Sequence, residues 1–168
     1  GIYRLLIAID VDKISRLHNG SYMVKNPNPQ YPNDTRENRI SAAFDALALM
    51  FQGYLFAKKS RYLPQVEFLG GIAAVTDPFR FMVSPARARP VNGRLVPWYI
   101  MDTLERARRF RDSVSKLNVL EVYYFDNEFN YEAKSQGITI KRVGSFEELV
   151  AVIRDAALRI VRSKAGKG

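Results

Sequence analysis

The sequence predicts an α/β protein of the α+β class, with one domain over residues 1–168 built from a mainly antiparallel sheet and helices. Its 168 residues, 47% of them hydrophobic, are enough for one real core. Short apolar runs between Gly, Pro and Asn turns are typical of strands, and longer runs at helical spacing are typical of helices. Runs joined by a short turn must pair antiparallel, because a parallel pair needs a crossover of about a dozen residues.

Composition excludes several kinds of site. The chain has no cysteine and a single histidine, His18, which excludes disulfides, thiolate sites and multi-histidine zinc sites. No apolar run reaches the roughly 18 residues of a membrane span and no signal peptide is visible, so a cytoplasmic protein is expected. The net charge of +9 favours an anionic partner, a nucleotide or a nucleic acid. The alternative is a basic surface that only keeps the protein soluble, as in a thermophile.

The first expected strand covers residues 5–12 and is buried on both faces, because its first five residues are apolar. It ends in Asp10-Val11-Asp12, and alternation along a strand places the two carboxylates on one face. Carboxylates this close repel each other unless a cation lies between them, and a divalent metal is the commonest cation there. The alternative is a polar turn in which Asp12 caps the next segment.

A loop and a long helix are expected next. Residues 19–35 are rich in Asn, Pro and Tyr and predict a long loop. Asp34 or Thr35 can cap a helix from residue 36 to about residue 58, which has a broad apolar face and is followed by Pro64.

Turn residues then divide the chain into short strands. Gly70-Gly71 and Asn92-Gly93 each predict a tight hairpin, since both sequences favour positive φ. Asp77-Pro78 predicts a turn between the two hairpins. The strands expected around these turns are 66–69 and 72–75, then 79–83, then 88–91 and 95–99.

The last third of the chain alternates helices and strands. Asp102 and Ser145 each begin a capping-box sequence, which predicts helices to about residue 116 and about residue 163. Residues 119–125 predict a second buried strand, which ends in Asp126. The segments expected between that strand and the last helix are a short polar helix ended by Gly137 and a strand at 138–143.

One family resemblance rests on Ile9-Asp10-Val11-Asp12-Lys13-Ile14, the helix after it and Phe68-Leu69-Gly70-Gly71. These motifs resemble the nucleotidyl-cyclase palm, a group that includes the GGDEF diguanylate cyclases. The resemblance implies a ferredoxin-like palm in which Asp10 and Asp12 are catalytic and hold Mg²⁺, while Gly70, Gly71 and Lys13 approach the phosphates of a nucleotide. Ile72-Ala73 replace the acidic pair of that family, so the second motif is degenerate.

A second resemblance competes with the first. Asp10-Val11-Asp12 with the run 122–128 is similar to the haloacid-dehalogenase phosphatases. It implies that Asp10 attacks phosphorus, that Asp12 protonates the leaving oxygen and that Asp126 holds magnesium opposite Asp10. It also implies a phosphate-binding hydroxyl from Thr76 or Ser84, with Arg94 where that family has a lysine.

A third hypothesis is nucleic-acid binding without catalysis. Between residues 80 and 111 eight arginines face only Asp102 and Glu105, and arginine forks match phosphate oxygens. The arginines expected to contact nucleic acid are Arg87, Arg89, Arg106 and Arg109. Phe81, Trp98 and Tyr99 could stack on bases. The alternative is a solvated helix face beside a basic hairpin.

These hypotheses lead to one prediction with alternatives. We expect a protein that binds nucleotide or nucleic-acid phosphates through a degenerate palm, with Asp10, Asp12 and Asp126 around Mg²⁺. A magnesium-dependent phosphatase and a non-catalytic nucleic-acid-binding protein are the alternatives, so whether the chain is an enzyme stays open. A homodimer is also left open.

Overall fold

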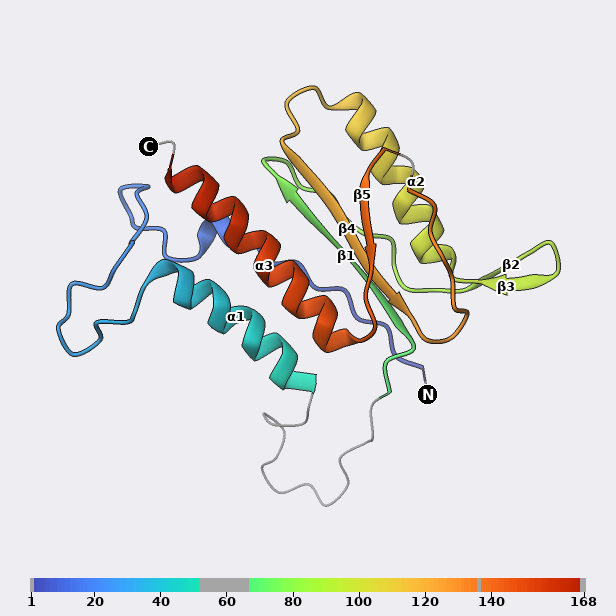
Figure 1. Ribbon diagram of the computed structural model, residues 1–168, viewed down its shortest axis with the longest axis horizontal. Helices are drawn as coiled ribbons and strands as arrows, with labels where there is room; N and C mark the ends of the chain where they lie inside the picture. Colours follow the sequence, from blue (N-terminus) through green and yellow to red (C-terminus); the bar gives the residue numbers. More distant parts are fainter. Residues whose placement is uncertain (1, 52–66, 136, 167–168) are drawn as a thin grey trace, which may run out of the picture. The chain divides into compact units, whose positions relative to one another are not determined.

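The computed structural model describes residues 2–51, 67–135 and 137–166. Within these residues, three α-helices and two small sheets confirm the α+β class, which is compatible with a ferredoxin-like fold (Figure 1). None of the described helices is long and apolar enough to cross a membrane. After a 3₁₀ helix at Val11–Lys13 the elements are α1 (Arg36–Phe51), β1 (Gly70–Asp77), β2 (Arg89–Val91), β3 (Arg94–Val96), α2 (Trp98–Ser113), β4 (Val119–Asp126), β5 (Thr139–Arg142) and α3 (Phe146–Ala165).

The chain divides into two compact units. The sheet unit consists of Gly1–Ile7 and Glu67–Ile153, and the loop–helix unit consists of Ala8–Val66 and Arg154–Gly168. Helix α3 therefore contributes to both units. The expectation of one domain over residues 1–168 stays a prediction.

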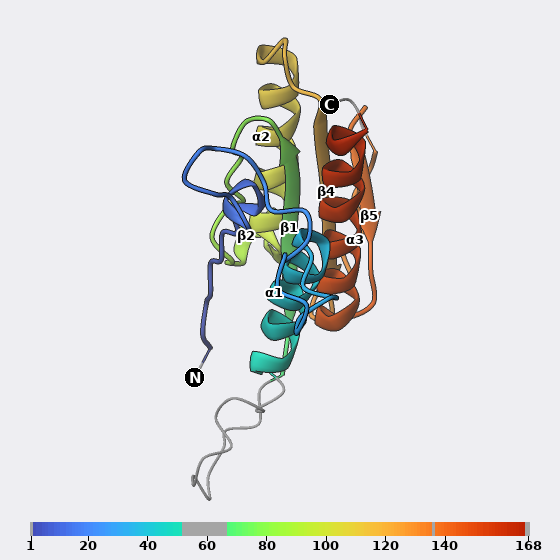
Figure 2. The same cartoon turned by 90° about the vertical axis from the view of Figure 1, so that its left-hand side faces the viewer.

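Strand β4 is the centre of the sheet unit. It pairs antiparallel with β1 and parallel with β5, and every residue from Val122 to Asp126 is buried (Figure 2). On one face Val122 and Tyr124 join Ile100 and Leu104 of α2 in the core. A strand covered on both faces is a continuous apolar run, which is why the expectation for 119–125 is confirmed.

The expected hairpin at Gly70-Gly71 is wrong. Both glycines lie in β1, which runs unbroken to Asp77 beside β4. The two glycines allow neighbouring side chains to lie close to the backbone of β1. A Cβ on Gly70 would meet the hydroxyl of Tyr99, and a Cβ on Gly71 would lie 2.7 Å from Cε1 of Phe125. The missing side chains let β1 pack against bulky neighbours on both faces of the sheet. Val66, which the expected hairpin included, lies outside the described residues.

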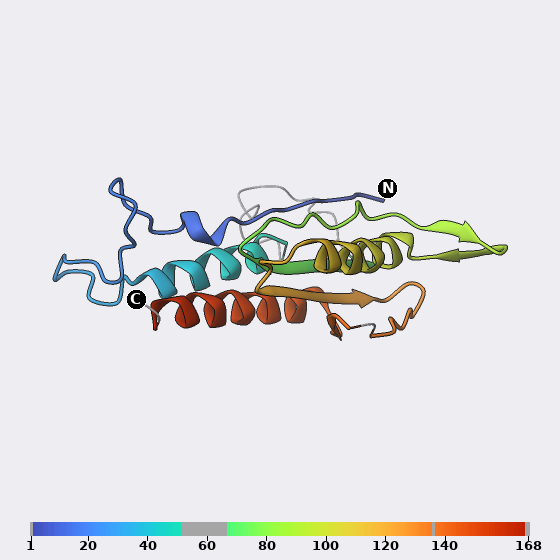
Figure 3. The same cartoon turned by 90° about the horizontal axis from the view of Figure 1, so that it is seen from above.

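The second expected hairpin is confirmed. Strands β2 and β3 pair antiparallel, and Asn92 and Gly93 between them have φ of +50° and +76°, as a tight hairpin turn requires. The hairpin extends away from the rest of the sheet unit (Figure 3). The chain also leaves β1 at the expected Asp77-Pro78 turn, but residues 79–83 form no strand.

Helix α2 begins earlier than its expected capping box. It starts at Trp98, after Pro97, so Asp102 lies inside the helix. The carboxylate of Asp102 accepts a hydrogen bond from the hydroxyl of Ser84 (2.5 Å). The carboxylate that was expected to cap the helix therefore bonds to Ser84, a residue of the segment after β1.

The segments after β4 follow the expectations except for one helix. Strand β5 and helix α3 lie where they were expected, and the hydroxyl of Ser145 accepts a hydrogen bond from the backbone N–H of Glu148 (3.1 Å). The carboxylate of Glu148 accepts one from the N–H of Gly144 (2.6 Å), the residue before the cap. The expected short polar helix is wrong, because 127–135 and 137–138 lie in neither helix nor strand.

The expected first strand is also wrong. Residues 2–10 lie in neither helix nor strand, and Leu5, Leu6 and Ile7 are 59%, 50% and 42% exposed. An apolar run becomes a buried strand only where neighbouring strands and helices receive it. In the sheet unit, β4 is a strand that is covered in this way.

In the loop–helix unit, Arg36 organises the loop that precedes α1. Its buried guanidinium donates hydrogen bonds to the carbonyls of Ile14 (3.1 Å) and Val11 (3.3 Å) and stacks on the ring of Tyr22 (4.1 Å). Residues 19–35 contain no helix or strand, as expected.

Helix α1 has the expected start and the expected apolar face. The hydroxyl of Thr35 accepts a hydrogen bond from the N–H of Asn38 (3.2 Å), and Ile40 and Phe44 are buried. Ion pairs from Arg162 to Glu37 (3.1 Å) and from Arg154 to Asp45 (3.3 Å) show that α3 runs antiparallel to α1 in this unit. The expected end of the helix, from residue 52 to Pro64, lies outside the described residues.

Substitution of Gly70 by alanine tests the close packing of β1. We expect Gly70→Ala to lower the free energy of unfolding by about 1–3 kcal/mol, because the added methyl overpacks the contact with Tyr99. Urea denaturation measures the change. Gly166→Ala is the matched control, since its nearest atoms would be 3.8 Å away, and it should change stability by less than about 0.5 kcal/mol. Equal effects of the two substitutions would contradict this account.

Asp34 predicts a pH dependence. Hydrogen bonds from Arg39 and from Asn26 hold the pKa of Asp34 at about 2, below its model-compound value of 3.8. Because the folded state lowers this pKa, the stabilisation is complete above pH 3.8 and is lost as the pH falls towards 2. Unfolding measured between pH 5 and pH 2 should therefore show a shallower loss of stability in Asp34→Asn than in the parent chain. Parallel curves would refute the prediction.

Candidate nucleic-acid interface

Helix α2 presents arginines and an aromatic ring on one flank. Arg106, Arg109, Phe110 and Ser113 recur at spacings of three and four residues, which puts them on one side of a helix. A different flank of the helix, which includes Ile100, is buried against the sheet. The packing of α2 on β4 therefore decides which side chains of the helix can meet a partner.

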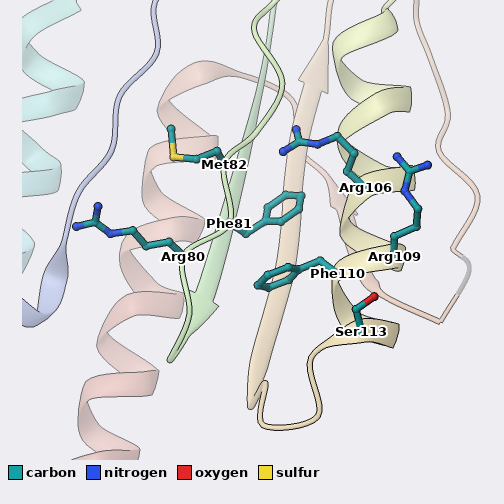
Figure 4. Close-up of a pocket in the computed structure, with 7 residues that line it drawn as sticks. All are labelled: Arg80, Phe81, Met82, Arg106, Arg109, Phe110 and Ser113. Carbon is teal, nitrogen blue, oxygen red and sulfur yellow. The ribbon is translucent and has the colours of Figure 1, made fainter.

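These α2 residues line an open hollow together with Arg80, Phe81 and Met82 of the segment after β1 (Figure 4). The hollow has a volume of about 510 Å³. Figure 4 shows the rings of Phe81 and Phe110 side by side, with the guanidinium of Arg106 near Phe81. Arg109 lies farther out on α2 and points away from the two rings, and Arg80 extends away from α2. We call these five residues the arginine–aromatic surface: Arg80, Phe81, Arg106, Arg109 and Phe110.

Direct contacts join the cations of this surface to its rings. The centroids of Phe81 and Phe110 are 5.4 Å apart at a tilted angle of 49°, and the guanidinium carbon of Arg106 lies 5.3 Å from the centroid of Phe81. Both distances fall within the range of favourable aromatic and cation–π contacts. One N–H of Arg106 also donates to the hydroxyl of Ser84 (2.9 Å). Phe81 packs against the core, which fixes the position of its ring in this surface.

Arg109 lies at the outer edge of the hollow. Its ion pair with Glu105 is 3.5 Å long, and the two side chains are 67% and 59% exposed. Such a solvated pair contributes about 0.3–0.5 kcal/mol, so a phosphate can displace the carboxylate at little cost.

Two of the expected arginines, Arg89 and Arg94, lie in the β2–β3 hairpin, and Arg87 lies just before it. Arg87 and Arg94 are exposed, whereas the guanidinium of Arg89 lies 5.1 Å from the ring of Trp98. The chain just before the hairpin is joined to α2 by a hydrogen bond from the N–H of Tyr99 to the carbonyl of Arg87 (3.3 Å). It is a second basic element of the sheet unit.

Three of the sequence-selected residues face away from a partner. Arg111 donates to the carbonyl of Gly137 and to the carboxylate of Asp112, and the charge of Arg108 acts on Tyr131, where it lowers the pKa of the phenol against the larger effect of burial. Tyr99 is buried, and burial raises the pKa of its hydroxyl, as do the nearby carboxylates of Asp126 and Glu128. Tyr99 therefore cannot stack on a base, and the stacking rings left from the prediction are Phe81 and Trp98. The sequence reasoning missed Phe110, which the helical spacing from Arg106 could have revealed.

The residues expected to bind metal or phosphate near the N-terminus lie in the loop–helix unit. Asp10 precedes the 3₁₀ helix and forms an ion pair with Lys13 (3.6 Å), and Asp12 lies 4.0 Å from the ammonium of Lys164. Their expected setting, the end of a buried strand, is absent from residues 2–13. Gly70 and Gly71, the expected phosphate-approach turn, lie instead in a straight strand of the sheet unit.

Asp126 lies at the end of β4 in the sheet unit and is buried. Its carboxylate accepts hydrogen bonds from the backbone N–H groups of Glu128, Phe129 and Tyr131, at 3.1, 3.0 and 2.8 Å. These bonds give it a structural function, which is to fold the chain back after β4. Among the described residues no group of three or more His, Asp or Glu side chains could hold a metal ion. The assignment of Mg²⁺ to Asp10, Asp12 and Asp126 stays a prediction.

One family model matches the chain. It is described as "DevR: CRISPR-associated negative auto-regulator DevR/Csa2", and it covers residues 1–93 of the 168. No curated protein and no solved structure matched. The match overturns both earlier resemblances, to nucleotidyl cyclases and to haloacid-dehalogenase phosphatases. Both relied on Asp10-Val11-Asp12 ending a buried strand, and residues 2–10 form no strand.

Trp98 is the only tryptophan of the chain, so its fluorescence reports on the base of the hairpin. We expect Arg89→Ala to shift its emission to longer wavelength, because water replaces the guanidinium over the ring. The loss of this cation–π contact should also lower stability by about 0.5–1 kcal/mol. Arg94→Ala, on the other strand of the hairpin, is the control and should leave the emission unchanged. An unchanged spectrum in Arg89→Ala would show that the guanidinium of Arg89 does not cover the ring of Trp98 in solution.

Proposed function

The chain belongs to the CRISPR-associated DevR/Csa2 family, and from this premise we propose that it binds nucleic acid without catalysing a reaction on it. The arginine–aromatic surface is the site of binding, and the β2–β3 hairpin adds a second basic contact. The family description supports a regulatory function, since it names a negative auto-regulator. A protein that represses its own expression acts on its own gene or transcript, directly or through a partner.

The observation that carries the proposal is the combination of arginines and aromatic rings that line one hollow. Arg106 and Arg109 come from α2 together with Phe110, and Phe81 enters from the segment after β1. Single-stranded nucleic acid needs this combination, because its phosphates require positive charge and its unpaired bases require a stacking surface. A merely soluble basic surface would need no rings between its arginines.

Charge favours the same partner over a longer range. The net charge of +9 attracts polyanions, and arginine forks hold phosphate oxygens in a defined geometry. The guanidinium of Arg106 rests on Phe81 and donates one hydrogen bond to Ser84, which leaves other N–H donors for a phosphate. Arg109 forms a solvated ion pair that a phosphate can displace. Each arginine that neutralises a phosphate releases a counterion, which makes the affinity depend on salt.

Substitution of Arg109 tests the proposal. Binding of a labelled single-stranded oligonucleotide, DNA or RNA, is measured by fluorescence anisotropy between 50 and 300 mM salt. We expect Arg109→Ala to reduce the slope of log affinity against log salt by about 0.7, the contribution of one single-strand phosphate. Lys141→Ala removes an equal charge from β5 and is the matched control, whose slope should be unchanged.

Substitution of Phe110 separates stacking from charge in the same assay. Phe110→Leu keeps an apolar side chain but removes the ring, so affinity should fall by about tenfold while the salt slope stays the same. Equal affinity of the parent chain, Arg109→Ala and Phe110→Leu would refute this surface as the binding site. Turnover of the oligonucleotide by the parent chain would refute the non-catalytic part of the proposal.

A further inference from the structure

Ser84 joins the segment after β1 to helix α2 by three hydrogen bonds. Its backbone N–H donates to the hydroxyl of Thr103 (2.9 Å), and its own hydroxyl donates to the carboxylate of Asp102 (2.5 Å) and accepts from Arg106 (2.9 Å). Ser84 and Thr103 are 6% and 0% exposed, so the bond between them is buried, while the two bonds of the Ser84 hydroxyl are partly buried. Buried hydrogen bonds of this kind fix geometry, because breaking one leaves a polar group unsatisfied.

This connection determines where the guanidinium of Arg106 lies. One of its N–H groups is held by Ser84, and its face covers Phe81, which precedes Ser84 by three residues. Ser84 therefore holds the cation in place and also fixes the distance between the ring and α2. A guanidinium has five N–H donors, and an arginine held in this way can turn other donors towards a phosphate.

The hydroxyl also bridges a carboxylate and this cation. Asp102 is one helical turn before Arg106, a spacing at which the two side chains commonly form an ion pair. The oxygen of Ser84 lies between them, so the proton of the hydroxyl satisfies Asp102 while its lone pair receives Arg106. The atom that Arg106 contacts here is therefore a neutral hydroxyl oxygen and not the carboxylate itself.

We propose that Ser84 is a positioning residue of the nucleic-acid site, which pre-orients Arg106 over Phe81 for contact with a phosphate. The inference rests on the proposed function, because it assigns Ser84 a function in that same binding. An arginine that is already ordered loses less rotamer entropy on binding. Removal of the hydroxyl should therefore weaken binding by about three- to tenfold while the phosphate contact itself remains possible.

A double-mutant cycle tests the inference with the oligonucleotide assay described above. The four chains are the parent, Ser84→Ala, Arg106→Ala and the double variant, and urea denaturation checks that each is folded. Ser84→Ala should weaken binding three- to tenfold in the parent and by less than about 1.5-fold in the Arg106→Ala chain. Thr103→Val is the structural control, since it loosens the same connection without touching Arg106, and it should leave the affinity unchanged.

A second pair of variants covers the case in which Ser84→Ala does not fold. The side chains of Ser84→Thr and Ser84→Val have the same shape, but only threonine keeps the hydroxyl. The Ser84→Thr chain should therefore bind the oligonucleotide three- to tenfold more tightly than the Ser84→Val chain. Equal affinity of this pair, or equal effects of Ser84→Ala in both backgrounds, overturns the positioning function while the proposed binding stands. If Arg106→Ala binds as tightly as the parent chain, this cation takes no part in binding, and both the assignment of Arg106 to the site and the function of Ser84 fail.

Discussion

The burial of β4 on both faces is the constraint on which the sheet unit depends. Five consecutive residues, Val122 to Asp126, are buried, and each large apolar side chain among them gains about 1.5–3 kcal/mol from leaving water. That gain requires a helix on each face and a close strand on one edge. Helix α2 covers one face, the start of α3 covers the other, and Gly70 and Gly71 let β1 approach between them.

The candidate interface is a consequence of that burial. Because Ile100 and Leu104 turn towards β4, the flank of α2 with Arg106, Arg109 and Phe110 is placed outside the core. The segment after β1 has neither helix nor strand from residue 78 to residue 88, so side-chain hydrogen bonds and packing hold it instead. One of these connections is at Ser84, close to where Phe81 lies beside Arg106.

Two short motifs misled the sequence analysis for physical reasons. Asp10-Val11-Asp12 was interpreted through a buried strand that residues 2–10 do not form, and the family match assigns the chain elsewhere. Gly70-Gly71 was interpreted as a turn because glycine permits positive φ. Glycine also permits the close approach of a neighbouring strand or ring, and only the surroundings decide between the two uses.

The sequence by itself determined the elements whose signals are local. These were the loop at 19–35, the caps of α1 and α3, the Asn92-Gly93 turn, the continuous apolar run of β4 and the excess of arginine between 80 and 111. Only the tertiary structure decided which of those arginines lie beside rings. It directs Arg111 to a backbone carbonyl, Arg89 to Trp98, and Arg106 to Ser84 over Phe81. Local signals depend on residues within one helical turn or hairpin, whereas each of these contacts depends on how a distant segment packs against α2.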